Sequence, residues 1–436
     1  ACFWLKQVSF NKGDSTDSKG ARTTGDASFD TYEFASTKVA EFPLVAARPL
    51  VMARTLDTLA SNIHACQPAA QFHLSVESTQ PLPTRQTLDE RRNSAASLRR
   101  QSIAWQEELD WECYALYGLL PADATELRYS TTELPEVEFG ERAFEIVLAR
   151  RLAAGQEASA WFERHGSTPV TEIPSHWPED YRQVVQRRID LIEGDRNIGL
   201  IERPVYKRRW NTPAWNDLER AALRDWLLDH LEVPHLWPAS DDHPPLLTTV
   251  NRLADVVRAD ADFMQIAELY AGHSGFDVAQ VVAELVGSES VPFLPVLRYK
   301  DTGLRKRAQW EDTWALQRLE DAGESVGNIP VPPKYKSADF LMANFWRLRG
   351  GLDVPKERWV SYPGCERGAD TSLPIAWAGW NHLQQATALA AYYLDMKDNE
   401  GWPRERLQPL LAGLLELVPW LKQWHNEVDP TYGERM

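Results

Sequence analysis

Residues 87–119 read TLDERRNSAASLRRQSIAWQEELDWECYALYGL, and this stretch carries a strong helical pattern. Apolar residues form a stripe with polar residues between them, which favours an amphipathic helix. The stripe consists of Leu98, Ile103, Leu109, Tyr114 and Leu116. Gly118 followed by Pro121 is the usual signal for the end of a helix. The stretch therefore predicts a long helix as a main element of the fold.

Helical patterns recur along most of the chain. Further helices are expected over residues 43–63, 139–165, 181–192, 214–231, 250–269, 276–286, 311–322, 384–396 and 407–424. Residues 197–204 and 206–210 alternate in a way that permits short strands, and residues 290–297, with two prolines, predict an extended segment. Residues 66–86 are rich in Pro, Gln, Ser and Thr and predict a linker. We expect a mainly α fold with minor β, built from several helical subdomains.

Length and charge limit the possible functions. A chain of 436 residues suggests about two to four structural units. The formal net charge is −16, so the average field repels phosphates and nucleic-acid binding would need a local basic patch. No apolar run approaches the ~18 residues of a membrane span, so no membrane contact is expected. The 4 cysteines are far apart and contain no C-x-x-C pair, which favours a reduced, cytoplasmic protein.

Several catalytic motifs are absent from the sequence. It contains no G-x-G, so neither a dinucleotide loop nor the usual S-adenosylmethionine loop is present. The P-loop, the G-x-S-x-G motif and the H-E-x-x-H motif are also missing. The 10 histidines are scattered without metal-ligand spacing. We therefore assign no catalytic, cofactor-binding or metal-ligating residue.

One segment, residues 334–362, interleaves cations with aromatic residues. Within the wider stretch 293–358, 12 Lys or Arg stand against 9 Asp or Glu. Such a surface can pair its cations with phosphates and stack its rings on bases. The candidate DNA-binding residues here are Lys334, Lys336, Arg347, Arg349, Lys356 and Arg358. A structural role stays open, because Arg also stacks on aromatic rings in ordinary interdomain contacts and nearby acids can neutralise the cations.

Two smaller basic clusters are present. Lys207, Arg208 and Arg209 precede Trp210, and the same two interpretations apply to them. Lys300 and residues 305–307 lie beside an acidic helical stretch and are expected to be solvated.

Four segments of the chain resemble one protein family. They are residues 1–7 with 32–34 and 41–44, residues 106–119, residues 188–210 and residues 333–380. The most specific matches are QEELDW from Gln106, and PKY, WRLRG and LDVPKER from Pro333, Trp346 and Leu352. In these segments the chain resembles the C-terminal portion of the adenine-specific DNA methyltransferases of BREX/Pgl bacteriophage-defence systems, the PglX family. The first segment is similar to the closing strand and helix of a target-recognition region.

The resemblance implies an enzyme that transfers a methyl group from S-adenosylmethionine to adenine in DNA. That chemistry needs a glycine-rich cofactor loop and a Pro-Pro-aromatic loop that grips a flipped-out adenine, and neither occurs in these 436 residues. Together with the start at Ala1 inside a family segment, this predicts a fragment whose catalytic half is missing. S-adenosylmethionine is expected for the whole enzyme and no cofactor for this chain. The expected partners are double-stranded DNA, the missing N-terminal methyltransferase half and other phage-defence proteins.

The resemblance and the patterns together predict five regions. They are the end of a target-recognition region (1–50), a helix and linker (51–86), a helical region (87–170), a helical region with short strands (171–290), and the basic–aromatic segment with closing C-terminal helices (291–436). Three functions follow in order of preference: a DNA-engaging module of a defence methyltransferase, a protein-interaction scaffold in the same assembly, and an unrelated enzyme. The 18 tryptophans favour the second, because Trp is enriched at interfaces.

Overall fold

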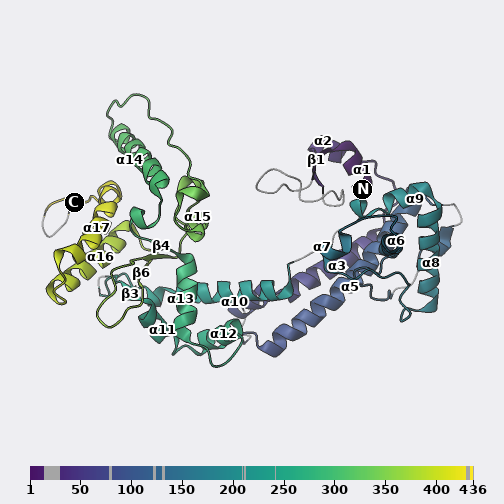
Figure 1. Ribbon diagram of the computed structural model, residues 1–436, viewed down its shortest axis with the longest axis horizontal. Coiled ribbons are helices and arrows are strands. Elements are labelled where there is room, and N and C mark those ends of the chain that lie inside the picture. The colour runs from purple at the N-terminus through teal and green to yellow at the C-terminus, as the bar shows by residue number, and fades with distance from the viewer. Residues whose placement is uncertain are drawn as a thin grey trace. The chain divides into compact units, whose positions relative to one another are not determined.

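The computed structural model describes residues 1–13, 30–77, 81–120, 124–129, 133–208, 210, 213–240, 242–428 and 433–435. The chain forms two compact units, an N-terminal unit (1–219) and a C-terminal unit (220–436), each of which is described by itself. Helices dominate both units and the sheets are small, so the predicted mainly α class is confirmed (Figure 1). The Gly-, Ser-, Thr- and Asp-rich composition of residues 11–30 predicts a loop, which lies mostly outside the described residues.

The N-terminal unit consists mainly of helices. They are α1 (Cys2–Val8), α2 (Ser36–Ala40), α3 (Leu50–Cys66), α4 (Pro68–Glu77), α5 (Arg85–Leu116), α6 (Ala143–Ala153), α7 (Trp161–His165), α8 (Glu179–Gly194), α9 (Arg196–Ile201) and the start of α10 (Trp215–Leu231). Strands β1 (Phe10–Gly13) and β2 (Thr31–Glu33) pair antiparallel. Helix α4 lies within residues that we expected to be a linker.

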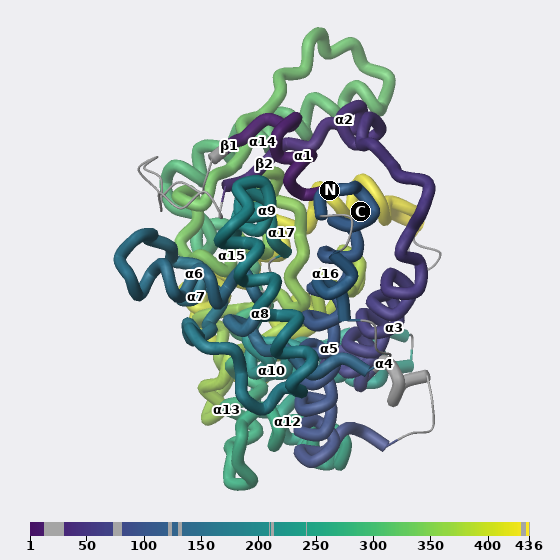
Figure 2. Tube along the Cα trace, turned by 90° about the vertical axis from the view of Figure 1, so that its right-hand side faces the viewer, coloured from purple at the N-terminus to yellow at the C-terminus, as the bar shows by residue number. Residues whose placement is uncertain are grey.

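Helix α5 is the predicted long helix, and its start is capped by its own sequence. The Thr84 hydroxyl accepts a hydrogen bond from the Thr87 amide at 3.2 Å, and the Thr84 amide donates to the Thr87 hydroxyl at 2.7 Å. This reciprocal pair satisfies free amides of the first turn. Helix α3 packs alongside α5 (Figure 1 and Figure 2). On its other side α5 buries Ile103 and Trp111 in a core shared with α6 and α8.

The strands expected over residues 197–204 and 206–210 are wrong. Residues Arg196–Ile201 form α9, and Pro204–Tyr206 form a single 3-10 turn. The Asp195 side chain accepts hydrogen bonds from the amides of Asn197 and Ile198, which caps the new helix. Burial of Ile198 in the core accounts for the apolar alternation that suggested a strand.

The C-terminal unit combines helix pairs with a small mixed sheet. Its helices are the rest of α10, α11 (Val250–Val257), α12 (Ala261–Ala271), α13 (Val278–Glu289), α14 (Asp301–Asp321), α15 (Ala343–Arg349), α16 (His382–Asp398) and α17 (Arg404–Trp424). The sheet has the order β3 (Thr248–Thr249), β6 (Pro374–Trp377), β5 (Trp359–Ser361) and β4 (Ser290–Pro292). Only the β4–β5 pair is parallel.

The sheet joins the basic–aromatic segment to the rest of the C-terminal unit. Trp359 pairs with Ser290 on one side and Trp377 on the other, and its side chain is fully buried. An aromatic and aliphatic core lies beside the sheet and includes residues 299, 335, 340, 345 and 348. Helices α16 and α17 pack against each other as a pair. In the part of the chain that the structure describes, no helix is both long and apolar enough to cross a bilayer.

Candidate functional site

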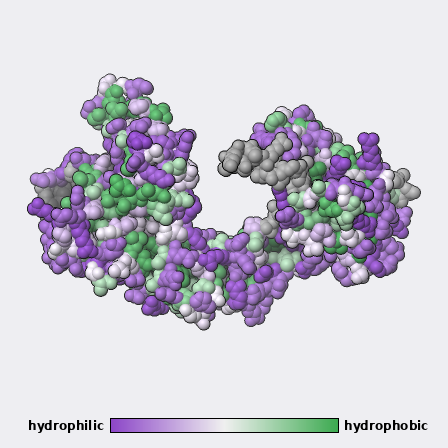
Figure 3. Space-filling model, viewed as in Figure 1, coloured by the Kyte–Doolittle hydropathy of each residue, from purple (hydrophilic) through white to green (hydrophobic). Residues whose placement is uncertain are grey.

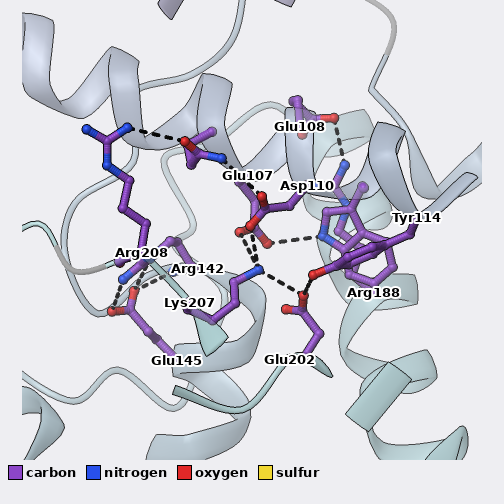
Figure 4. A network of polar contacts seen from close by, with 12 residues as sticks. Glu107, Glu108, Asp110, Tyr114, Arg142, Glu145, Arg188, Glu202, Lys207 and Arg208 are labelled. Carbon is purple, nitrogen blue, oxygen red and sulfur yellow. Dashed lines mark hydrogen bonds and ion pairs between the residues drawn. The ribbon is translucent and has the colours of Figure 1, made fainter. Parts of the chain in front are cut away.

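Lys207 is the centre of a buried group of charges in the N-terminal unit. Its ammonium lies 2.8 Å from an Asp110 carboxylate oxygen, 2.8 Å from a Glu202 oxygen and 3.9 Å from a Glu107 oxygen. Glu107 and Asp110 share one face of α5, being three residues apart. Glu202 ends α9, and the turn that follows brings Lys207 back against α5 (Figure 4). We call these four residues the Lys207 cluster.

Charge in the Lys207 cluster is unbalanced, with three carboxylates around one ammonium. Burial by itself would lower the pKa of Lys207, but Asp110 and Glu202 outweigh it and raise that pKa well above its usual value. Burial raises the pKa of Glu202 in spite of the adjacent Lys207. The Tyr114 hydroxyl donates to Glu202 at 2.6 Å, and burial together with that carboxylate raises the pKa of Tyr114 well above 10. Lys207 is therefore held in its charged form.

Two further buried ion pairs flank the cluster. Arg142 binds Glu145 through two hydrogen bonds of 2.9 and 2.7 Å, and both side chains are buried. Arg188 donates to Glu108 at 2.7 Å, with both side chains almost fully buried. The Arg188–Glu108 pair joins α8 to α5, whereas the Arg142–Glu145 pair lies within the first turn of α6 (Figure 4).

The burial of Lys207 corrects one sequence-based prediction. Only 2% of its side chain is exposed, and its ammonium is already hydrogen-bonded to two carboxylates. A phosphate could reach it only by displacing these carboxylates from the interior, so Lys207 is withdrawn from the candidate DNA contacts. Its observed role is to hold the α9–α10 connection against α5.

We expect Glu202→Gln to change how stability depends on pH. Because the pKa of Glu202 is raised from 4.5 in the folded chain, the folded state binds its proton more tightly. The wild type should therefore lose stability relative to the variant as pH rises above 4.5 towards the folded-state value. Urea denaturation at a series of pH values measures this difference. Glu193→Gln, on an exposed position of α8, is the control, and parallel wild-type and Glu202→Gln curves would contradict the account.

Arg208, the neighbour of Lys207, is exposed. Its guanidinium lies 4.0 Å from the ring centre of Trp210, and its nitrogen donates to Gln106 at 3.4 Å. It remains a candidate for contact with a phosphate. Arg209, predicted beside it, lies outside the described residues.

The three predicted arginines of the basic–aromatic segment all have acidic partners. Arg358 pairs with Asp229 at 2.7 Å and with Glu232. Arg349 pairs with the buried Glu357.

Arg347 is the most exposed of the three. It donates to Glu289 at 2.8 Å and to the Ser288 carbonyl at 2.7 Å, yet 54% of its side chain is exposed. Burial alone would raise the pKa of Glu289, but hydrogen bonds from Arg224 and Arg347 lower it. The sequence left open a structural role in which nearby acids neutralise the cations of this segment. Its three arginines have that role.

The three predicted lysines are placed differently from the arginines. Lys334, Lys336 and Lys356 are all exposed, and within the described residues none of them has an ion pair. Lys334 and Lys336 flank the buried Tyr335, and Lys356 precedes the buried Glu357. We call these three residues the exposed lysine set. Their ammonium groups are available to a phosphate.

The third basic cluster is only partly solvated. Lys300 and Arg305 are exposed, as expected. Lys306 instead pairs with Asp339 at 2.6 Å, and Arg307 pairs with Glu311 at 2.7 Å and with Glu416. Sequence reasoning also missed Arg298, which the fold places close to Arg349. Its only sequence signal was a cation beside Tyr299.

A cavity of about 480 Å³ opens in the C-terminal unit between β3 and α16. Its polar groups are largely engaged with one another. Arg367 binds Asp395 at 2.5 Å and Glu400 at 3.0 Å, and Asp370 accepts hydrogen bonds from Thr249, Asn251 and Ser372.

Comparison with known proteins identifies the family. A family model described as "Domain of unknown function (DUF7008)" matches residues 102–436, and the chain belongs to this family. The chain is also 48% identical, over 445 residues, to the adenine-specific methyltransferase PglX of Streptomyces coelicolor. This match confirms the resemblance to PglX methyltransferases that the sequence predicts. The match covers 99% of the chain and 35% of the relative, so the chain spans about a third of that protein's length. No solved structure matches the chain.

Proposed function

We propose that this chain is the DNA-engaging accessory part of an adenine-specific, S-adenosylmethionine-dependent DNA methyltransferase of a bacterial phage-defence system. It acts in the cytoplasm on double-stranded DNA, and methyl transfer requires catalytic residues outside this chain. The observation that carries the proposal is the exposed lysine set, on a chain 48% identical to an adenine-specific methyltransferase. Free ammonium groups bind phosphates without regard to sequence, and they can do so locally despite the overall negative charge.

The cavity in the C-terminal unit does not fit S-adenosylmethionine. A donor site of the usual kind needs a carboxylate that is free to accept hydrogen bonds from the ribose hydroxyls. Here Asp395 and Glu400 are both bound to Arg367, and Asp370 is saturated by its own neighbours. We therefore place no methyl-transfer step in this cavity.

Two assays on the full chain test the proposed function. We expect it to bind duplex DNA weakly, with an affinity that falls as salt rises, when titrated into a labelled duplex and followed by fluorescence anisotropy. We expect no methyl transfer when the same chain is incubated with duplex and radiolabelled S-adenosylmethionine. Turnover by this chain alone would refute the claim that methyl transfer requires residues outside it. The absence of any duplex binding at low salt would refute the claim that the chain engages DNA.

A second candidate is a protein-interaction scaffold in the same assembly. Leu411, Leu415 and Trp424 of α17 are exposed by 42%, 70% and 64%. Leu411 and Leu415 are one turn apart and share a helix face. Apolar residues also gather on one side of the C-terminal unit in Figure 3. Exposed apolar patches of this kind often bind proteins. A pull-down with the other defence proteins that is negative for every one of them would reject this candidate.

A further inference from the structure

Arg298 is a charged side chain with an unused hydrogen-bond donor. Its main chain is fixed, because its amide donates to the Pro295 carbonyl at 2.9 Å and its carbonyl accepts from the Leu341 amide at 2.9 Å. Within the described residues its guanidinium makes no hydrogen bond or ion pair, and its Nε is buried without an acceptor. Arg298 as a whole is partly buried, and because a guanidinium stays protonated in proteins, its buried Nε–H is a charged donor without an acceptor.

A second guanidinium lies close to Arg298. Burial, and next the charge of Arg349, lower the pKa of Arg298, with Asp353 opposing them. Arg349 is bound to Glu357 and, at 3.5 Å, to Asp353, but its Nε is also buried without an acceptor. The two unused Nε–H donors therefore belong to neighbouring cations. Such an arrangement costs free energy unless an anion lies between them.

The surroundings hold the two arginines in place. The Arg298 guanidinium lies 5.6 Å from the ring centre of Tyr299, which stacks on Tyr335 at 5.2 Å. Asp353, whose carboxylate contacts Arg349, has a backbone φ of 52°, a conformation that non-glycine residues adopt at a cost. Strain of this kind persists where the surrounding structure enforces it, and it is concentrated at binding sites. The site is therefore built before any ligand arrives.

We propose that Arg298 and Arg349 form a binding site for a phosphate group. Guanidinium groups present planar, forked donors that match the oxygens of a phosphate, and each of these two has an Nε–H donor still unused. The inference rests on the proposed function for its source, a phosphodiester of duplex DNA. Free inorganic phosphate has the same chemistry, and the experiment below separates the two sources.

The test compares the wild-type chain with Arg298→Gln and with a control, Arg305→Gln. Arg305 is exposed on α14 and has no ion pair among the described residues, so its removal changes the net charge equally. Isothermal titration with inorganic phosphate, against chloride at equal ionic strength, measures anion binding. We expect Arg298→Gln to weaken phosphate binding on the order of tenfold to hundredfold, the loss of one or two charge-assisted hydrogen bonds, and Arg305→Gln to leave it unchanged.

Thermal denaturation shows whether the loss is only a folding defect. Because the Arg298 guanidinium makes no hydrogen bond or ion pair among the described residues, Arg298→Gln should keep or raise the midpoint of the wild type. A large fall in that midpoint would assign Arg298 to the structure and overturn the inference. Failure of the wild type to bind phosphate in preference to chloride would overturn it as well.

Duplex titration of the same variants identifies the source of the phosphate. If Arg298→Gln weakens phosphate and duplex binding together, the site takes the DNA backbone. If it weakens only phosphate binding, the site stands but takes a free anion. If the wild type binds phosphate but no duplex, the proposed function fails while the Arg298 site is supported. Duplex binding without phosphate binding refutes the site and leaves the proposed function intact.

Discussion

Replacing Lys207 by Met is expected to destabilise the N-terminal unit by about 3–5 kcal/mol, the usual cost of removing one partner from a buried ion group. Lys207 is the single cation that contacts Glu107, Asp110 and Glu202 in the described part of the cluster. Met fills a similar volume but leaves the buried Glu107 and Glu202 and the partly exposed Asp110 without the positive charge that contacts them. Urea denaturation of the full chain, followed by circular dichroism, measures the change.

Two further variants make this prediction specific. Arg208→Gln changes the adjacent exposed residue and should shift stability by less than about 0.5 kcal/mol, as surface substitutions usually do. Adding Asp110→Asn and Glu202→Gln to Lys207→Met removes two of the uncompensated charges and should recover part of the loss. If Lys207→Met were as stable as the wild type, the ion pairs of the Lys207 cluster would not be what stabilises the packing of Lys207 and Glu202 against α5.

Changing the exposed lysine set, Lys334, Lys336 and Lys356, to Gln together is expected to weaken duplex binding roughly 10- to 100-fold. Each exposed ion pair with a phosphate contributes up to about 1 kcal/mol, and 1.4 kcal/mol corresponds to tenfold in affinity. None of the three lysines has an ion pair within the described residues, so the fold should not change. Fluorescence anisotropy with a labelled duplex at fixed salt measures the loss.

A control with the same charge change tests whether position matters. Lys397, Arg404 and Lys422 are exposed on α16 and α17 of the same unit, and their joint replacement by Gln removes the same three charges. This control should retain most of the affinity. Equal losses in both triple variants would mean that net charge, and not the exposed lysine set, governs binding.

Much of the fold was predictable from the sequence, because helical periodicity is a local signal. The stripe over residues 87–119 predicted α5, and residues 214–231 predicted α10. The error over residues 197–210 has a physical cause. A six-residue helix leaves too few turns for its period to differ from an alternating pattern, and its capping by Asp195 becomes visible only in the fold.

The candidate site was less predictable, because the partners of its charges are distant in sequence. Lys207 meets Asp110 across 97 positions, and Arg358 meets Asp229 across 129. A pattern of cations and aromatic residues cannot separate an arginine held by such an acid from a free lysine. Arg298 shows the reverse case, since nothing in its neighbours along the chain indicated that its Nε–H would lack an acceptor.

The salt dependence of duplex binding tests the central claim most directly. The claim is that this chain binds DNA through the ammonium groups of the exposed lysine set. Each phosphate contact contributes about 0.9 to the slope of log affinity against log salt, so the triple variant should lower that slope by about 2.7 relative to the wild type. A slope identical in wild type and variant, or no duplex binding by the wild type at low salt, would contradict the claim.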